Sequence, residues 1–453
     1  MDLVFRNVRV VGTNGIEEKD VGVAAGRIAA VEEPGSSLAG GQIIVGKGLH
    51  LIPGLIDTHM HVRGPAFSHR EDFFSGTAAA AAGGITTIFE MPVSRPPTYS
   101  VEVLASRIEC AKEQALVDFA FYGAAGKDNL GHIAALAEAG VIGFKTFTQK
   151  APPGREHEFR GLCAASSADL YEVFNEVGKT GLLAAVHAEE DSLIGLFAGR
   201  GDDPYSFGRP PVVELEAVAR SLVLARSAGA RLAICHTSLP ESVELVESAR
   251  IMGQEVYMET CFHYLAASQE DVKRADRFAK IKPPLRDKAR AAKLYQMYRD
   301  GRLDYLGSDH APFTAEEKLA DPAPDGLAAV ELTLPLLLAR VKKGEITLER
   351  LVETCCSNPA SIFGLYPRKG IIAVGADADL VLLDLNKSGR VRLDKLKTKA
   401  KVCATIYDGW ETGGEVLMTM VRGQAVINHG QITGKPGWGQ FVRPENLSGK
   451  SED

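Results

Sequence analysis

Long apolar runs are missing from this sequence. None of its segments reaches about 18 consecutive apolar residues, the length that crosses a membrane as a helix. The first segment, MDLVFRNVRVV, carries charges at positions 2 and 6 and has no continuous apolar core, so we do not expect it to act as a signal peptide. These two absences argue against a membrane partner.

Cysteine pairs and blocks of like charge are also missing. The seven cysteines are an odd number and include no C-x-x-C pair, so they predict neither a disulfide framework nor a thiolate zinc site, and they fit a reducing cytoplasm. Charged residues make up 24% of the chain, and the net charge of -7 is not gathered into one block. This pattern disfavours nucleic acid or an anionic membrane as the principal partner. We expect a cytoplasmic protein.

The two ends of the 453-residue chain differ from its middle in their sequence pattern. Both ends consist of short alternating segments broken by glycine, a pattern typical of antiparallel strands and hairpins. We therefore predict one small β-sandwich domain made by residues 1–52 and 369–443, followed by a tail at 444–453. The middle, residues 53–368, is predicted to be a separate domain.

Eight short β-rich runs alternate with helical stretches in this middle part. They read LIDTHMHV, GITTIFEMP, VDFAFYGAA, VIGFKTFT, LLAAVHAE, RLAICHTS, EVYMETCFHYL and LDYLGSDHAP. The segments between them have helical features, such as PESVELVESARIMG, which starts with proline and ends at glycine. Eight β-α units predict an α/β fold, a (β/α)8 TIM barrel, whose active site lies at the C-terminal ends of the strands.

The first run ends in two histidines one residue apart, His59 and His61. Side chains of a strand alternate between faces, so these two point the same way and Met60 points the opposite way. Two polar residues at a fraying strand end are one explanation. A metal site is the other, because neutral imidazole is the commonest protein ligand for zinc-like ions.

The other runs favour the metal site. Six residues of types that bind metals lie at the C-terminal ends of five of these runs. They are His59 and His61 in the first, Lys145 in the fourth, His187 in the fifth, His236 in the sixth and Asp309 in the eighth. Each alone has a structural explanation, as a core histidine, a strand-end lysine or a helix N-cap. Six such groups at one mouth of a barrel favour a functional site.

Lys145 is the unusual member of this set, because an ammonium next to a metal cation is repelled by it. The difficulty disappears if the amine has reacted with carbon dioxide, since the resulting carbamate is an anion with two oxygens that can bridge two metals. A hydroxide shared by two divalent metals would then be the nucleophile. Asp309 could bind one metal, take the proton of that hydroxide and pass it to a leaving nitrogen.

A family resemblance rests on these residues. The segments GLIDTHMHV, GGITTIFEMP, GFKTF, VHAEE, CHTS, PPLR and GSDHAP resemble those of the cyclic amidohydrolases of the dihydroorotase, allantoinase and hydantoinase group. The resemblance covers essentially the whole chain. It implies hydrolysis of a cyclic amide ring and a homo-oligomer, either a tetramer or a dimer. It also assigns ligands: His59, His61 and Asp309 to one metal, His187 and His236 to the other, and carboxylated Lys145 to both. Zinc suits these ligands best, although cobalt or manganese also fits them.

The ring that is opened is ambiguous in the sequence. Arg63 completes H-x-H-x-R, which resembles dihydroorotases, and an arginine fork suits a substrate carboxylate. Dihydroorotases, however, would have asparagine and histidine where this chain has Val93 and Phe313. We therefore expect weak activity on dihydroorotate and a preference for neutral or ureido-substituted rings.

Other segments, among them SRPPTYS and GWGQFV, look more like allantoinases and L-selective hydantoinases. There the residue before PPLR is usually serine or asparagine, but here it is Lys282, and Asp325 stands where many hydantoinases have asparagine. We predict that Lys282 and Asp325 shape the substrate pocket, whether by contacting the substrate or each other. Dihydroorotase activity is the alternative. A non-catalytic scaffold on the same fold is the alternative from another class, and it is disfavoured because all six ligand-type residues are present.

Overall fold

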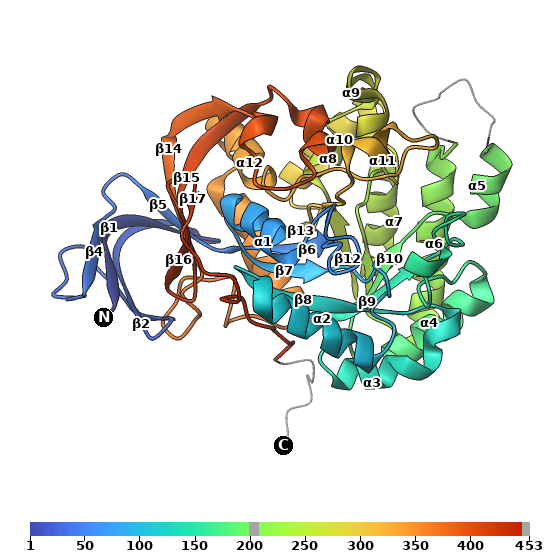
Figure 1. Cartoon of the computed structure of the whole chain (residues 1–453), viewed down its shortest axis with the longest axis horizontal. Helices are drawn as coiled ribbons and strands as arrows, with labels where there is room; N and C mark the ends of the chain where they lie inside the picture. The colour runs from blue at the N-terminus through green and yellow to red at the C-terminus, as the bar shows by residue number, and fades with distance from the viewer. Residues whose placement is uncertain (199–207, 446–453) are drawn as a thin grey trace.

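The computed structural model describes residues 1–198 and 208–445. Its central feature is a sheet of eight parallel strands surrounded by helices (Figure 1). The strands are β6 (Leu55–Met60), β7 (Ile85–Glu90), β8 (Asp118–Ala124), β9 (Gly143–Phe147), β10 (Ala184–His187), β11 (Leu232–Ile234), β12 (Val256–Thr260) and β13 (Tyr305–Leu306). The first and last meet just beyond their ends, where the His61 N–H donates to the His310 carbonyl at 2.8 Å. The predicted (β/α)8 barrel is confirmed.

The helices cover the outside of this barrel (Figure 1). They are α1 (Phe73–Ala82), α2 (Val101–Gln114), α3 (Ile133–Glu138), α4 (Ser167–Gly178), α5 (Asp191–Phe197), α6 (Pro211–Ala228), α7 (Pro240–Ile251), α8 (Phe262–Ala266), α9 (Gln269–Ala275), α10 (Lys288–Arg299), α11 (Ala315–Leu319), α12 (Thr333–Lys342), α13 (Leu348–Val352) and α14 (Asn358–Ile362). Among the residues described, no helix has the length and apolar content needed to cross a membrane.

Local sequence signals explain where several helices begin. Helix α1 follows Asp72, whose carboxylate accepts a hydrogen bond from the Ser75 N–H at 2.7 Å and so caps the first turn. Helix α7 has Pro240 in its first turn, where the missing N–H of proline costs no hydrogen bond. Helix α7 lies in the segment PESVELVESARIMG, where the sequence predicted a helix that starts with proline and ends at glycine.

The two ends of the chain form one hydrogen-bonded sheet beside the barrel. Its strands are β1 (Leu3–Gly12), β2 (Gly15–Ala24), β3 (Arg27–Glu32), β4 (Gln42–Val45), β5 (His50–Pro53), β14 (Leu380–Arg390), β15 (Glu411–Val421), β16 (Gln424–Asn428) and β17 (Gln431–Ile432). Strand β5 joins the two ends, because it pairs in parallel with β1 and antiparallel with β14. Blue and red strands therefore lie side by side in Figure 1. The small β domain built from both termini is confirmed.

A buried ionic cluster connects this sheet to the barrel. The Lys369 ammonium lies 2.8 Å from the Asp118 carboxylate on β8 and 2.5 Å from Asp379, which precedes β14. All three side chains are buried, so the charges must satisfy one another. This pairing fixes the orientation of the terminal sheet relative to the barrel strands.

The C-terminal segment returns to the barrel. The Val442 N–H donates to the Phe119 carbonyl on β8 at 2.9 Å, and the Glu445 N–H donates to the Gly364 carbonyl at 2.8 Å. Of the tail predicted at 444–453, the first two residues are therefore held against the barrel. Residues 446–453 lie outside the described part of the chain.

Candidate active site

All nine residues that the sequence selected line one cavity at the C-terminal end of the barrel strands. They are His59, His61, Arg63, Lys145, His187, His236, Lys282, Asp309 and Asp325. The cavity measures about 80 Å³ and is closed on several sides by apolar side chains, among them Val93 and Phe159. The barrel therefore gathers in one place groups that lie up to 266 residues apart in sequence, from position 59 to position 325.

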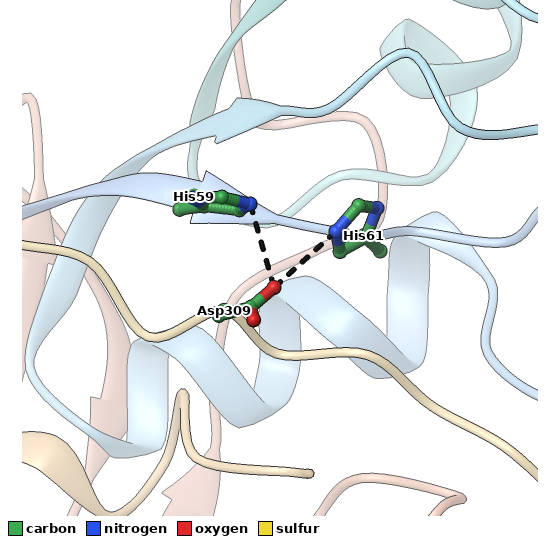
Figure 2. Close-up of side chains that lie close together, drawn as sticks. All are labelled: His59, His61 and Asp309. Carbon is green, nitrogen blue, oxygen red and sulfur yellow. Dashed lines mark ion pairs between the residues drawn. The ribbon is translucent and has the colours of Figure 1, made fainter. Parts of the chain in front are cut away.

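Figure 2 shows the first group, in which His59 and His61 both turn toward Asp309. The Nε2 atoms of the two histidines each lie 3.4 Å from Oδ1 of Asp309. Asp309 has a φ of +45°, a left-handed conformation that is unfavourable for a residue with a side chain. This conformation directs its carboxylate back toward the histidines. The three ligand atoms lie within 4.8 Å of one another, close enough for one ion.

The second group consists of His187, the last residue of β10, and His236, which follows β11. Nδ1 of His187 lies 3.0 Å from Nε2 of His236. Burial lowers the pKa of His187 to about 4 and that of His236 well below its ordinary value. Both imidazoles are therefore neutral at pH 7, the form in which a ring nitrogen has a lone pair for a metal.

Lys145 lies in β9 between these two groups. Its side chain is fully buried, and its Nζ has no hydrogen-bond partner among the described residues. Its Nζ lies over the Phe147 ring, 5.3 Å from the ring centroid. A buried amine without a polar partner is costly, because no other group replaces its lost hydration. The position therefore suits an amine that is altered chemically or lies beside another charged species.

Taken together, these groups fit divalent metal ions. Four imidazoles and one carboxylate converge around a buried amine, and Nδ1 of His61 and Nδ1 of His236 have no partner within the described chain. Imidazole and carboxylate are the usual protein ligands of zinc and of similar ions. The donor set is therefore one that a metal would complete.

Glu259, at the C-terminal end of β12, is a site residue that the sequence analysis missed. Its carboxylate accepts hydrogen bonds from His59 Nδ1 at 2.6 Å, from Thr58 Oγ1 at 2.7 Å and from the His236 backbone N–H at 3.1 Å. Burial lowers the pKa of His59, but the Glu259 charge outweighs it and raises that pKa to about 10. At pH 7 the metal-free His59 is therefore an imidazolium, and a metal would bind at Nε2 in place of the proton there, because Nδ1 donates to Glu259. In the sequence, Glu259 is a glutamate near the end of the predicted strand in EVYMETCFHYL.

Glu189 holds the second histidine pair in a similar way. Its carboxylate lies 2.8 Å from Nε2 of His187 and also pairs with Arg209. Burial alone would raise the pKa of Glu189, but the Arg209 guanidinium and the His187 contact lower it to about 2. The anion is thus permanent, and it keeps Nδ1 of His187 as the nitrogen turned toward His236. Glu189 was present in the VHAEE motif, but the sequence analysis gave it no role.

The three predicted substrate residues differ in their pairing. Arg63 is buried, donates from Nη1 to the Val93 carbonyl at 3.0 Å and lies 4.0 Å from Glu158. Lys282 and Asp325 contact each other, with Nζ and Oδ2 2.7 Å apart. They form an ion pair in the cavity wall, and the sequence had left open whether they do so.

Arg155 is a further lining residue that the sequence did not select. It comes from the loop after β9 and pairs with Glu158, with its Nε and Nη2 donating at 2.8 and 2.7 Å. His263, Tyr264 and His310 lie outside the lining of the cavity.

Comparison with known proteins gives a consistent result. Residues 50–426 match the model of the Amidohydrolase family. An L-hydantoinase from Paenarthrobacter aurescens is 35% identical, and the alignment covers 98% of each chain. An allantoinase from Solibacter usitatus is 36% identical, over 98% of this chain and 97% of its own. The solved structure of an L-hydantoinase (dihydropyrimidinase) from Arthrobacter aurescens superposes with a TM-score of 0.92 at 35% identity and covers 98% of this chain and 99% of that chain.

The role of Glu259 leads to a prediction about metal affinity. We expect Glu259→Gln to lose about tenfold in affinity for divalent metal, the lower end of the range for such supporting carboxylates. The reason is that the amide has lost the negative charge that strengthens His59 as a ligand. Competition with a chelator, read out as bound metal per chain, measures the effect. Glu255→Gln is the control, since that side chain is 50% exposed. Unchanged affinity in Glu259→Gln would contradict the role.

Proposed function

This chain belongs to the amidohydrolase family, and we propose that it is a two-metal enzyme that opens a hydantoin, allantoin or dihydropyrimidine type of ring. It is a hydrolase that acts on cyclic amides. The observation that carries the proposal is the convergence of four imidazoles, one carboxylate and one unpartnered buried amine in a single cavity.

We propose zinc as the metal. The proposed ligands fall into the two groups that the structure forms around Lys145. His59, His61 and Asp309 would hold one ion, and His187 and His236 the other. A carbamate on Lys145 would bridge the two, which would account for a buried Nζ without a hydrogen-bond partner among the described residues. Two such ions, when bound, lower the pKa of water from 15.7 toward about 7 and so supply a nucleophile at neutral pH.

The reaction adds one water across a ring amide. The water oxygen bonds to the carbonyl carbon, the C–N bond breaks, and the leaving nitrogen takes up a proton. Asp309 is the group proposed to move that proton, because its carboxylate reaches into the cavity. Burial raises the pKa of this carboxyl above its usual range, so it binds a proton more readily than an exposed aspartate does.

The pairing of Arg63 supports rings without a carboxylate on the ring carbon. Arg63 already donates to the Val93 carbonyl and lies near the Glu158 carboxylate. Nη1 of Arg63 is therefore already engaged, so a ring carboxylate would not meet the full guanidinium fork of this residue. Dihydroorotate is for this reason the weaker candidate.

A cytoplasmic location and a homo-oligomer complete the proposal. All seven cysteines are free in the structure, which suits a reducing compartment. A tetramer or a dimer is proposed from the family resemblance, and light scattering of the purified protein distinguishes the two from a monomer.

The deciding experiment is a panel of rings offered to the metal-loaded protein. Allantoin, 5-substituted hydantoins, dihydrouracil and dihydroorotate are compared by the rate of ring opening. Ring opening of at least one of the first three, at a higher kcat/KM than dihydroorotate, is expected. No turnover of any ring by fully metal-loaded protein would support the scaffold alternative.

Lys145→Ala should abolish activity and reduce bound metal, because the bridging carbamate is lost. Short carboxylic acids should restore part of the activity by occupying the same place. Intact mass and electron density of the metal-loaded protein test the carbamate directly. An unmodified ammonium in fully metal-loaded protein would overturn the two-metal proposal.

Asp309→Asn should lower kcat by at least about 100-fold, the lower range for general acid-base catalysis. The carboxamide oxygen can still touch a metal, but it cannot accept the proton. Bound metal must be measured in the same preparation, so that loss of a ligand is separated from loss of proton transfer. More than a tenth of the original activity with full metal content would exclude the proton-transfer role.

Arg63→Ala distinguishes the two kinds of ring. If a ring carboxylate binds Arg63, its loss should cost about 1.5–3 kcal/mol, or roughly tenfold or more in kcat/KM. Dihydrouracil is the matched substrate, since it is the same ring without the carboxylate. We expect native activity on dihydroorotate to be weak already. Efficient native turnover of dihydroorotate that disappears in Arg63→Ala would establish a dihydroorotase instead.

A further inference from the structure

Four cationic side chains surround the Phe313 ring beside the cavity. Their charged groups lie at 4.9 to 6.0 Å from the ring centroid: Arg63, Arg70, Arg155 and Lys318. Cations are attracted to the face of an aromatic ring, so Phe313 stabilises this arrangement. We call these four residues the cationic cluster.

The carboxylates paired with the cluster are fewer than its cations. Glu90 and Asp325 also lie near it, but Glu90 pairs with Arg107 and Asp325 pairs with Lys282. Glu158 is bound side-on by Arg155, and Glu317 lies 2.6 Å from Arg70. Lys318 is buried, and the hydrogen bonds of its ammonium go to the carbonyl oxygens of Lys280 and Pro324. Four cations and two paired carboxylates leave an excess of positive charge in a low-dielectric environment, where an anion is strongly attracted.

Donors within the cluster are also left without partners. Nε of Arg63 and Nη1 of Arg70 are buried and have no hydrogen-bond acceptor among the described residues. Arg155 uses Nε and Nη2 for Glu158, which leaves its Nη1 edge for a second acceptor. Unsatisfied buried guanidinium donors are costly and are rare unless a ligand completes them.

Two members of the cluster face the cavity at different depths. Arg63 and Arg155 both line it, but the Arg63 side chain is 3% exposed and the Arg155 side chain 24% exposed. Arg155 therefore stands at the rim and Arg63 nearer the metal ligands. Because Arg155 is more exposed than Arg63, an anion held between them can lie on an arm that extends from the ring toward solvent.

We propose that the cavity binds an anionic substituent of the substrate, a carboxylate at the end of a short arm on the ring, with Arg155 as the specificity-determining residue and Arg63 beside it. The donors left for this carboxylate are Nη1 of Arg155 and Nε of Arg63, because Nε and Nη2 of Arg155 already hold Glu158. Hydrogen bonds from a charged donor to a carboxylate are strong. The inference rests on the proposed function, because the arm belongs to the ring that is hydrolysed. It replaces the preference for neutral rings drawn from the sequence, in which Arg155 had no place.

The test compares two substrates of the same shape and different charge, hydantoin-5-acetic acid and hydantoin-5-acetamide. The metal-loaded enzyme should have a kcat/KM at least about tenfold higher on the acid, mainly through a lower KM. Arg155→Gln should reduce this acid-to-amide ratio at least about fivefold, and Arg155→Lys should restore part of it, because the charge returns without the fork. Arg160→Gln is the matched control from the same loop, since Arg160 is exposed and lies over Tyr99 outside the cavity lining.

The outcomes separate this inference from the proposed function. Turnover of both substrates without preference for the acid overturns the inference and leaves cyclic amide hydrolysis intact. A preference for the acid that persists unchanged in Arg155→Gln also overturns it. The wild-type ratio keeps the test decisive if Arg155→Gln does not fold. No turnover of any hydantoin, including neutral ones, instead removes the proposed function on which the inference rests.

Discussion

The hydrogen bond between the Glu259 carboxylate and Nδ1 of His59 is the interaction on which the site depends. It joins β12 to β6 at 2.6 Å, and the same oxygen accepts the His236 backbone N–H that follows β11. One buried anion therefore fixes three of the eight strands at the end where the chemistry is proposed to occur. Without this carboxylate, three buried donors would lose their acceptor and His59 would lose its orientation.

Burial then decides the charge of three imidazoles around that bond. His61, His187 and His236 are kept neutral because burial lowers the pKa of each. These three neutral imidazoles can bind metal without first losing a proton, whereas His59 has to release the proton on Nε2. The cost is an unpartnered amine on Lys145 and left-handed backbone at Asp309 and His236. Such strain persists only where the surrounding structure imposes it.

That surrounding structure includes segments far from the barrel strands. The Asp57 carboxylate accepts hydrogen bonds from the backbone N–H groups of His59 and Ser308, and so sets the backbone before both His59 and Asp309. On the other side, the Cys403 thiol contacts the carbonyl of Phe313, so the chain that leads to the terminal sheet supports the aromatic centre of the cationic cluster. The terminal domain thus contributes to the shape of the cavity as well as to stability.

The sequence alone predicted the barrel and the residues that the structure brings together at its mouth. A strand has a period of two residues, which places His59 and His61 on one face without knowledge of any other segment. Parallel barrel strands all end at one mouth, so residues at the ends of separate runs could be expected to meet. These inferences need only local pattern and the geometry common to all such barrels.

Only the tertiary structure decided how the remaining charges are shared. Glu259 lies 200 positions from His59, Lys282 pairs with Asp325, and Arg155 enters the cavity from a loop with no periodic pattern. Pairings of this kind depend on side-chain directions and loop paths that are fixed when the barrel closes. A distance of a few ångströms decides whether two charges neutralise each other or leave one free for a ligand, and residue order does not contain that distance.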